Sequence, residues 1–432
     1  MSAIPDTEAV DFRQIRRKDW TIIGLIGSAH SASHFFQLVF PTLYLSLAHE
    51  FGYDFVKLGL LASIFFLVSC LGQASSGFVV DRIGPAPVLR FGLASFVVSG
   101  VLIGSANGYA MLVLAAVIGG MGNSVFHPVD YSIMNHRVSP ARLGHAFSTH
   151  GLTGNLGWAL TPVFMATIIH LSNWRVAAFS AAGLVAFVLV LTWLGRSLLA
   201  GTNQQAVAAS AAPGASSGSQ VDLSRQSVGQ TLATLLVQPA LWGAFLFFMF
   251  TSVALSAVQN YTIPMLGDIY AIDKVLAGGT LSAYMIAAAV GMLAGGFLVG
   301  TTPNTERTVF VSLLLAGALL AVLALGTVPP VVAMGLVALA GFFSGVAAPS
   351  RDMLIRRVTP KGATGTVYGL VYSGMDVGSS LAPVGFGLML DAGLGRGPWF
   401  GAATAFAIAA VLAVWVARWA GRSVAAVSTA RA

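Results

Sequence analysis

The side chains best placed to do chemistry are four histidines and one aspartate in the first half of the chain. His30 and His34 stand four residues apart, so they share one face of a helix, and His127 precedes Asp130 by three residues. His150 follows on a later segment. At 1.5 Å per residue these histidines lie about 12–15 Å inside apolar segments. A histidine there can titrate near neutral pH, which suits proton coupling. The alternative is a set of neutral donors to carbonyls of neighbouring helices.

Four charged residues stand in otherwise apolar segments, where charge is costly and usually functional: Asp130, Arg351, Asp352 and Asp376. Asp130 and Arg351 lie about 221 residues apart, and we predict either that they pair and gate the molecule or that Arg351 holds an anionic ligand. Local neutralisation of Arg351 by Asp352 is the alternative. Asp376 either carries protons or bonds a neighbouring side chain.

These residues must be positioned by membrane-spanning helices. Hydrophobic residues make up 56% of the chain and charged residues 9%, which differs strongly from a soluble domain. About 20 apolar residues are needed to cross a bilayer. We predict twelve spans, near 20–46, 54–79, 86–106, 109–136, 142–171, 174–196, 233–267, 273–300, 306–326, 329–357, 362–391 and 397–420.

The spans fall into two groups of six. We expect residues 1–19 to form a cytoplasmic segment and 20–196 the first six-helix bundle. Residues 197–232, rich in Ala, Ser, Gly and Gln, read as a flexible cytoplasmic linker. The second bundle is predicted over 233–420, with a cytoplasmic tail at 421–432.

The two groups are related by an internal repeat. Residues Arg137 to Pro140 (RVSP) return as Arg357 to Pro360 (RVTP). At nearly the same offset Gly144, Gly157 and Pro162 return as Gly365, Gly378 and Pro383, and Asn155 aligns with Asp376. Duplicated membrane halves around a central site are the build of secondary transporters.

Charge predicts the orientation. The Lys and Arg residues gather on the side that holds both termini and the linker, which the positive-inside rule makes cytoplasmic. We therefore predict a multi-pass protein of a bacterial-type inner membrane with both termini inside. The net charge of +7 belongs to this rim, and because basic residues do not cluster with aromatics we expect no nucleic-acid partner.

A loop motif indicates a family. Residues Gly77 to Gly84 read GFVVDRIG and resemble the signature loop of the major facilitator superfamily. The resemblance implies an all-α fold of twelve transmembrane helices in two pseudo-twofold-related six-helix bundles. It also implies that Asp81, beside Arg82, caps the start of the eleventh helix near 362–365 and closes the cytoplasmic side.

The first half also resembles the fosmidomycin-resistance branch of this superfamily, a group of proton-driven exporters of drugs or organic anions. The residues that carry this likeness are the stretch from Gly120 to Pro128 (GMGNSVFHP) and that from Gly151 to Pro162. Two departures stand out, because the branch has an acid near the place of His34 and a Glu where this chain has Val129.

We therefore expect a monomeric, proton-coupled exporter of a small anionic or amphiphilic solute, with no catalytic residues, cofactor or metal ligands assigned, since no hydrolase or metalloprotease motif is present. Uptake of an organic anion is one alternative, and divalent-metal transport through His30, His34, His127 and Asp130 is another. The predicted proton-coupling residues are Asp130, His30, His34, His127 and Asp376, and the gating residues are Asp81, Arg82, Asp130, Arg351 and Asp352. The predicted substrate-binding residues, some of which could instead join helices, are Gln37, Asn123, His127, His150, Asn155, Gln259, Asn260, Tyr261, Arg351 and Tyr372.

Overall fold

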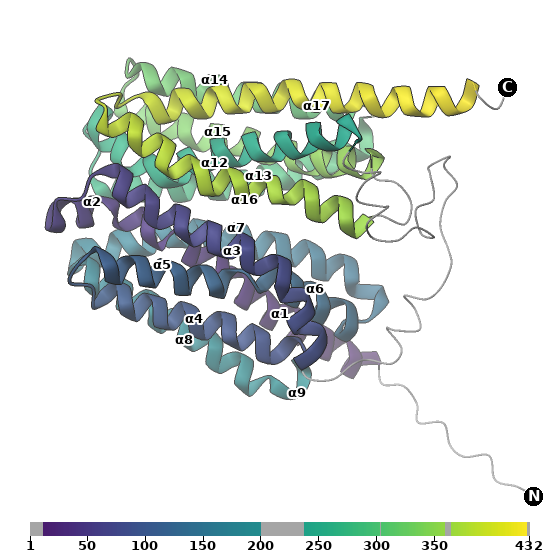
Figure 1. Cartoon of the computed structure of the whole chain (residues 1–432), viewed down its shortest axis with the longest axis horizontal. Helices are drawn as coiled ribbons and strands as arrows, with labels where there is room; N and C mark the ends of the chain where they lie inside the picture. Colours follow the sequence, from purple (N-terminus) through teal and green to yellow (C-terminus); the bar gives the residue numbers. More distant parts are fainter. Residues whose placement is uncertain (1–11, 200–236, 303, 359–363, 430–432) are drawn as a thin grey trace, which may run out of the picture.

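The computed structural model describes residues 12–199, 237–302, 304–358 and 364–429, and every regular element in these ranges is helical (Figure 1). The elements are α1 (Phe12–Gln37), α2 (Val39–Phe51), α3 (Phe55–Ile83), α4 (Pro85–Gly104), α5 (Tyr109–Asn123), α6 (Phe126–Arg137), the 3-10 turn η1 (Pro140–Arg142), α7 (Leu143–Leu171), α8 (Trp174–Leu194), α9 (Arg196–Leu199), α12 (Pro239–Tyr270), α13 (Lys274–Thr301), α14 (Thr305–Leu325), α15 (Pro330–Val358), α16 (Thr364–Asp391) and α17 (Gly397–Thr429).

The helices form two bundles with the same internal pairing. In the first bundle α1 packs on α7, α3 on α5, and α4 on α8. In the second, α12 packs on α16, α13 on α15, and α14 on α17. These pairs are equivalent under the repeat seen in the sequence. The fold of two related six-span halves is confirmed.

Repeated glycines set one of these pairings. A Cβ added at Gly157 would overlap the Ser31 carbonyl of α1, and a Cβ added at Gly378 would overlap the Met249 carbonyl of α12. Each glycine thus lets one helix touch the backbone of its neighbour, as small residues do in membrane helix packing. The repeat therefore conserves a packing contact in both halves.

Two of the predicted spans are broken near their middle. The first span is the pair α1 and α2, which meet at Leu38, and the fourth is the pair α5 and α6, which meet at Ser124 and Val125. A proline stands third in each following helix, Pro41 in α2 and Pro128 in α6. The first turn tolerates proline because its N–H groups have no intrahelical partner. The second break lies next to His127.

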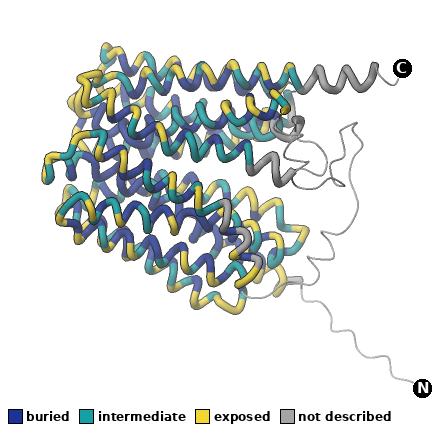
Figure 2. The backbone as a smooth tube through the Cα atoms, viewed as in Figure 1, coloured by how far each residue is buried: buried dark blue, intermediate teal, exposed yellow. Residues whose placement is uncertain are grey.

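Ten helices in the described residues are long and apolar enough to cross a membrane, where α5 and α6 are counted together as one span. The two predicted spans outside this set are the broken α1–α2 pair and α16. Large apolar side chains point away from the bundles, among them Phe187 at 61% exposure and Phe297 at 81%. Figure 2 shows buried residues along the helix faces turned toward neighbours and exposed ones on the outside. This outer surface suits lipid rather than water.

The two bundles meet at the end of the molecule opposite the chain termini, which we call the distal end. There α3 packs on α16 and α7 on α13, and Figure 1 shows the bundles diverging toward the end that holds the termini. A Cβ added at Gly59 of α3 would overlap the Pro383 carbonyl of α16. One added at Gly278 of α13 would lie 3.0 Å from the Pro162 carbonyl of α7. Both contacts pair equivalent glycines and prolines, so the duplicated halves close the distal end through a repeated contact.

Candidate functional site

The predicted histidines and Asp130 meet inside the first bundle. His30 comes from α1, Asp130 from α6 and His150 from α7, and all three are buried. His30 Nδ1 and His150 Nε2 each lie 3.1 Å from Asp130 Oδ2, and the two imidazole rings stack with centroids 3.5 Å apart. The carboxylate therefore lies against two imidazoles from two other helices. We call His30, Asp130 and His150 the acid–imidazole cluster.

A glycine makes room for the cluster. A Cβ added at Gly154 of α7 would lie 3.0 Å from His30 Nε2 and 3.0 Å from His34 Cε1. His34 packs against the cluster, with its ring centroid 4.4 Å from that of His30 and 4.3 Å from that of Trp158. This glycine therefore has a steric role at the site itself, in addition to general helix packing.

A hydrogen-bond network centred on Asn123 lies beside His34. The Oδ1 atom of Asn123 accepts from Ser33 and from Gln37, each at 3.0 Å, while its Nδ2 donates to Ser69 at 2.8 Å. Gln37 in turn accepts from the indole of Trp158 at 2.9 Å. The network joins α1, α3, α5 and α7. Two predicted substrate-binding residues, Gln37 and Asn123, thus bond each other and hold helices together in this conformation.

His127 differs from His30, His34 and His150 because its side chain is exposed. Its ring lies 6.2 Å from that of His150 and 6.4 Å from that of Tyr131, which is 44% exposed. His30, His127 and His150 each place one ring nitrogen within 4.8 Å of the other two. This side of the cluster is therefore the accessible one. Tyr131 was missed in the sequence, although it follows Asp130 directly.

The cluster has unused bonding capacity. Among the described residues, Asp130 Oδ1, His30 Nδ1 and both ring nitrogens of His34 are buried without a hydrogen-bond partner, so the 3.1 Å approach of His30 to Asp130 is an ion-pair contact and not a hydrogen bond. A charged carboxylate in such a place needs a positive neighbour, and a protonated imidazole can supply it. The arrangement can therefore hold, release or pass a proton between carboxylate and imidazole, or bind a cation.

The predicted pairing of Asp130 with Arg351 is not what the structure shows. Arg351 Nε donates to Asp352 Oδ1 at 2.9 Å, and its guanidinium lies 4.9 Å from the centre of the Phe248 ring. Phe248 also contacts Tyr372, at 4.8 Å between ring centroids. Asp130 meets histidines of its own bundle instead. The physical reason is that the bundles diverge toward this end, so each charge is neutralised within its own half.

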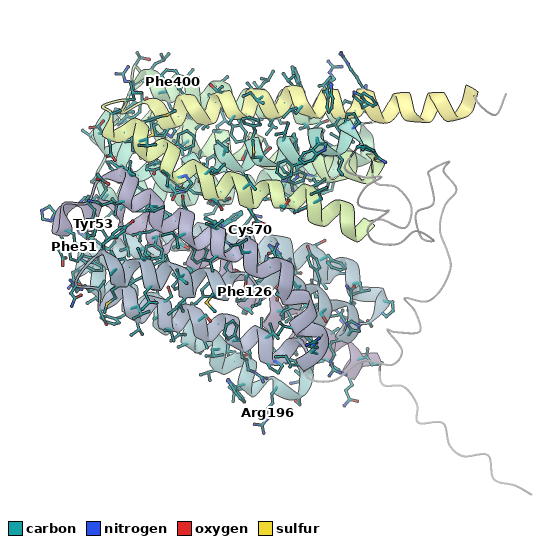
Figure 3. All side chains as sticks on the ribbon, in the orientation of Figure 1. Phe51, Tyr53, Cys70, Phe126, Arg196 and Phe400 are labelled. Atoms are coloured by element: carbon teal, nitrogen blue, oxygen red, sulfur yellow. The ribbon has the colours of Figure 1, made fainter. Side chains whose placement is uncertain are left out.

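Asp376 faces the other bundle. Its carboxylate on α16 is within hydrogen-bonding reach of the Cys70 thiol on α3. Figure 3 shows Cys70 where the first bundle meets the second. Asp376 is therefore separate from the acid–imidazole cluster, and Cys70 has a polar neighbour in addition to its apolar packing.

The polar stretch Gln259, Asn260 and Tyr261 of α12 is buried and contributes to the distal contact. Asn260 Oδ1 accepts from the Tyr44 hydroxyl of α2 at 2.9 Å, and the Tyr261 hydroxyl donates to the Pro383 carbonyl. In this conformation Asn260 and Tyr261 join helices rather than lining an open site, which is the alternative that the sequence left open, whereas Gln259 Nε2 is buried without a hydrogen-bond partner.

The remaining predicted residues lie apart from the cluster. Asn155 donates to the Gly151 carbonyl of its own helix at 3.0 Å. Arg82 is exposed at the end of α3. The side chain of Asp81 and residues 359–363 lie outside the described part of the structure, so the predicted cap on α16 stays a prediction.

Comparison with known proteins decides the family. The family model described as Major Facilitator Superfamily matches residues 25–383 and, in a second match, 257–430. The chain belongs to this superfamily. Its members are transporters, which agrees with the duplicated membrane fold and with the expectation that the chain is not an enzyme.

Individual relatives resemble the chain to different extents. The fosmidomycin resistance protein of Escherichia coli (strain K12) is 33% identical over 176 residues, which are 40% of this chain and 43% of that protein. The chain thus matches less than half the length of this relative. The uncharacterized MFS-type transporter YfnC of Bacillus subtilis (strain 168) is 25% identical over 86% of this chain and 87% of its own length.

Solved structures support the fold of this superfamily member. A bacterial homologue of the human lysosomal transporter Spinster, in an inward-facing and unoccupied conformation, superposes with a TM-score of 0.69 at 13% identity. The superposition covers 94% of this chain and 97% of that one.

Proposed function

We propose that the protein exports a small anionic or amphiphilic organic solute by alternating access, driven by protons that bind the acid–imidazole cluster. The observation that carries the proposal is Asp130, a fully buried carboxylate whose Oδ2 lies 3.1 Å from nitrogens of both His30 and His150. A group that must be neutralised by a proton at membrane depth is suited to couple proton movement to a conformational change.

The solute would enter the space between the bundles on the side of the exposed His127. Arg351 provides positive charge in the second bundle, and only Asp352 pairs with it among the described residues. The side chain of Asp352 is 48% exposed, so water weakens this pair and an anion can compete for the guanidinium. Support for an organic solute comes from the 176-residue likeness to the fosmidomycin resistance protein, whose name refers to a small organic compound.

The test is transport in proteoliposomes with a panel of organic anions and an imposed pH gradient. Wild-type protein should accumulate a transported anion against its gradient when protons flow the other way. Asp130→Asn should lose accumulation but keep exchange of labelled for unlabelled solute, because the neutral amide copies the protonated acid. His170→Asn, at an exposed histidine outside the cluster, serves as the control. Full proton-driven accumulation by Asp130→Asn would refute the coupling role.

The same vesicles decide direction. Export predicts solute movement opposite to the proton flux, whereas accumulation in the direction of the proton flux would establish the alternative of organic-anion uptake.

A second candidate function is transport of a divalent metal ion, favoured by the nitrogens of His30, His127 and His150 that lie within 4.8 Å of one another. His34, which the sequence suggested as a ligand, packs on Trp158 and is outside this group. Calorimetric titration of the purified protein with Zn²⁺ separates the two. Saturable 1:1 binding that disappears in His127→Ala and persists in His170→Ala would favour the metal carrier, and its absence would favour the organic solute.

A further inference from the structure

The end of α16 is tied to the start of α3 by a carboxylate that the sequence did not single out. Asp391, the last residue of α16, accepts from the backbone N–H of Phe55 at 2.9 Å and from that of Val56 at 2.8 Å. Each carboxylate oxygen takes one of these bonds. Asp54, the residue before α3, accepts from the N–H of Lys57 at 2.7 Å. Three of the free N–H groups at the start of α3 are therefore bonded, two of them by the opposite bundle.

The chemistry favours this contact. The first turn of a helix has unbonded N–H groups and a partial positive charge, and a carboxylate satisfies both. Close packing beside it holds the two helices in register, since a Cβ added at Gly387 of α16 would overlap the Phe55 carbonyl of α3. When the bundles separate at the distal end, both N–H groups must exchange the carboxylate for water. The contact therefore stabilises only the conformation in which the distal end is closed.

Among the described residues, the corresponding helix of the second half has no such cross-bundle tie. At the start of α13, Asp273 accepts from the N–H groups of Val275 at 2.9 Å and Leu276 at 3.1 Å, so this helix is capped by its own preceding residue. Asp54 and Asp273 occupy equivalent positions in the repeat. The start of α3 is thus capped across the interface by Asp391, whereas the equivalent start of α13 is capped within its own bundle. Because a helix start can be capped locally, the cross-bundle bonds of Asp391 are not needed for capping alone, which favours a role in gating.

We propose that Asp391 is the gate residue of the distal end, holding α3 and α16 together in the closed conformation and releasing α3 when this end opens. The arrangement mirrors the cap predicted for Asp81 of α3 on the start of α16. One antiparallel helix pair would then have an acid at the end of each helix, and each acid would close one side of the membrane in turn. The proposal rests on alternating access, but it does not depend on the solute or on proton coupling.

The experiment measures the distance between the bundles at the distal end. Spin labels are attached to cysteines in place of Leu171 and Val331, which are 76% and 74% exposed, in a Cys70→Ser background. Asp391→Ala removes the charge and both acceptors, so the open population should rise roughly fivefold to thirtyfold, as a change of about 1–2 kcal/mol implies. Asp391→Glu, which keeps the carboxylate, should restore a large part of the closed population.

Asp273→Ala is the matched control, because it removes a helix cap of the same chemistry within one bundle. It should lower the melting temperature without changing the distance distribution. An Asp391→Ala distribution identical to that of wild type would overturn the proposal, and so would an equal shift in Asp273→Ala. Because the distances are measured without solute or pH gradient, failure here is distinct from failure of the proposed transport function.

Discussion

Adding a single methyl group at Gly59 should open the distal end of the molecule. An ideal Cβ at this position would lie 2.7 Å from the Pro383 carbonyl carbon and 2.8 Å from the Tyr261 hydroxyl, whereas ordinary contact begins at 3.4 Å. The backbone of α3 must therefore move away from α16 and α12 by more than half an ångström. Overpacking of this kind costs about 1–3 kcal/mol. Because Gly59 and its neighbours belong to different bundles, the strain is relieved by separating the bundles rather than by unfolding one.

The size of the effect follows from the population shift. A change of about 1–3 kcal/mol between closed and open states alters their ratio roughly 5–150-fold. The assay is the rate at which a membrane-impermeant maleimide labels a single cysteine at Thr42, which is buried at the distal end in the closed state. In a Cys70→Ser, Thr42→Cys background, Gly59→Ala should raise this rate.

Two further glycines provide a graded series. Gly278→Ala should raise the rate less, because its Cβ would meet the Ala166 methyl at 2.9 Å and the Pro162 carbonyl at 3.0 Å. Gly279→Ala should leave it unchanged, since nothing lies within 4 Å of a Cβ there. Equal rates in all three variants, or fastest labelling in Gly279→Ala, would refute the reasoning.

Three other predictions concern polar contacts. Asn123→Leu leaves two donors and one acceptor of its network unpaired and should destabilise the first bundle by about 1–3 kcal/mol, measured as a lower melting temperature in detergent. Tyr44→Phe removes the hydroxyl that bonds α12 across the distal contact and should raise Thr42→Cys labelling about fivefold, as a bond worth about 1 kcal/mol implies. The hydrogen bond from the indole of Trp174, and after it the contact with Arg175, lowers the pKa of Glu50 below its usual 4.5. The ionised Glu50 therefore stabilises the fold above pH 4.5, and this stabilisation is lost as the pH falls through the lowered pKa. Glu50→Gln should flatten the melting temperature across that acidic range.

Sequence patterns predicted the helical spans and their division into two equivalent halves. Apolar length shows where a helix crosses a membrane, and the repeat shows which helices are equivalent. A grouping of His30, His127 and Asp130 could be proposed because helix spacing indicates which side chains share a face and how deep each lies in the membrane. Their placement together in the first bundle agrees with that expectation, while their role in coupling stays a prediction.

Only the tertiary structure decided which charges meet. Asp130 and Arg351 are equivalent under the repeat. Two residues related by a twofold axis touch only if they lie close to that axis and at the end where the bundles meet, and the repeat indicates neither. Contacts across the interface depend on the tilt between bundles, and the tilt is set by close approaches such as that of Gly59 to Pro383. For the same reason Asp391 gave no signal in the sequence, since an acid at the end of a helix caps another helix only when that helix's first turn faces it.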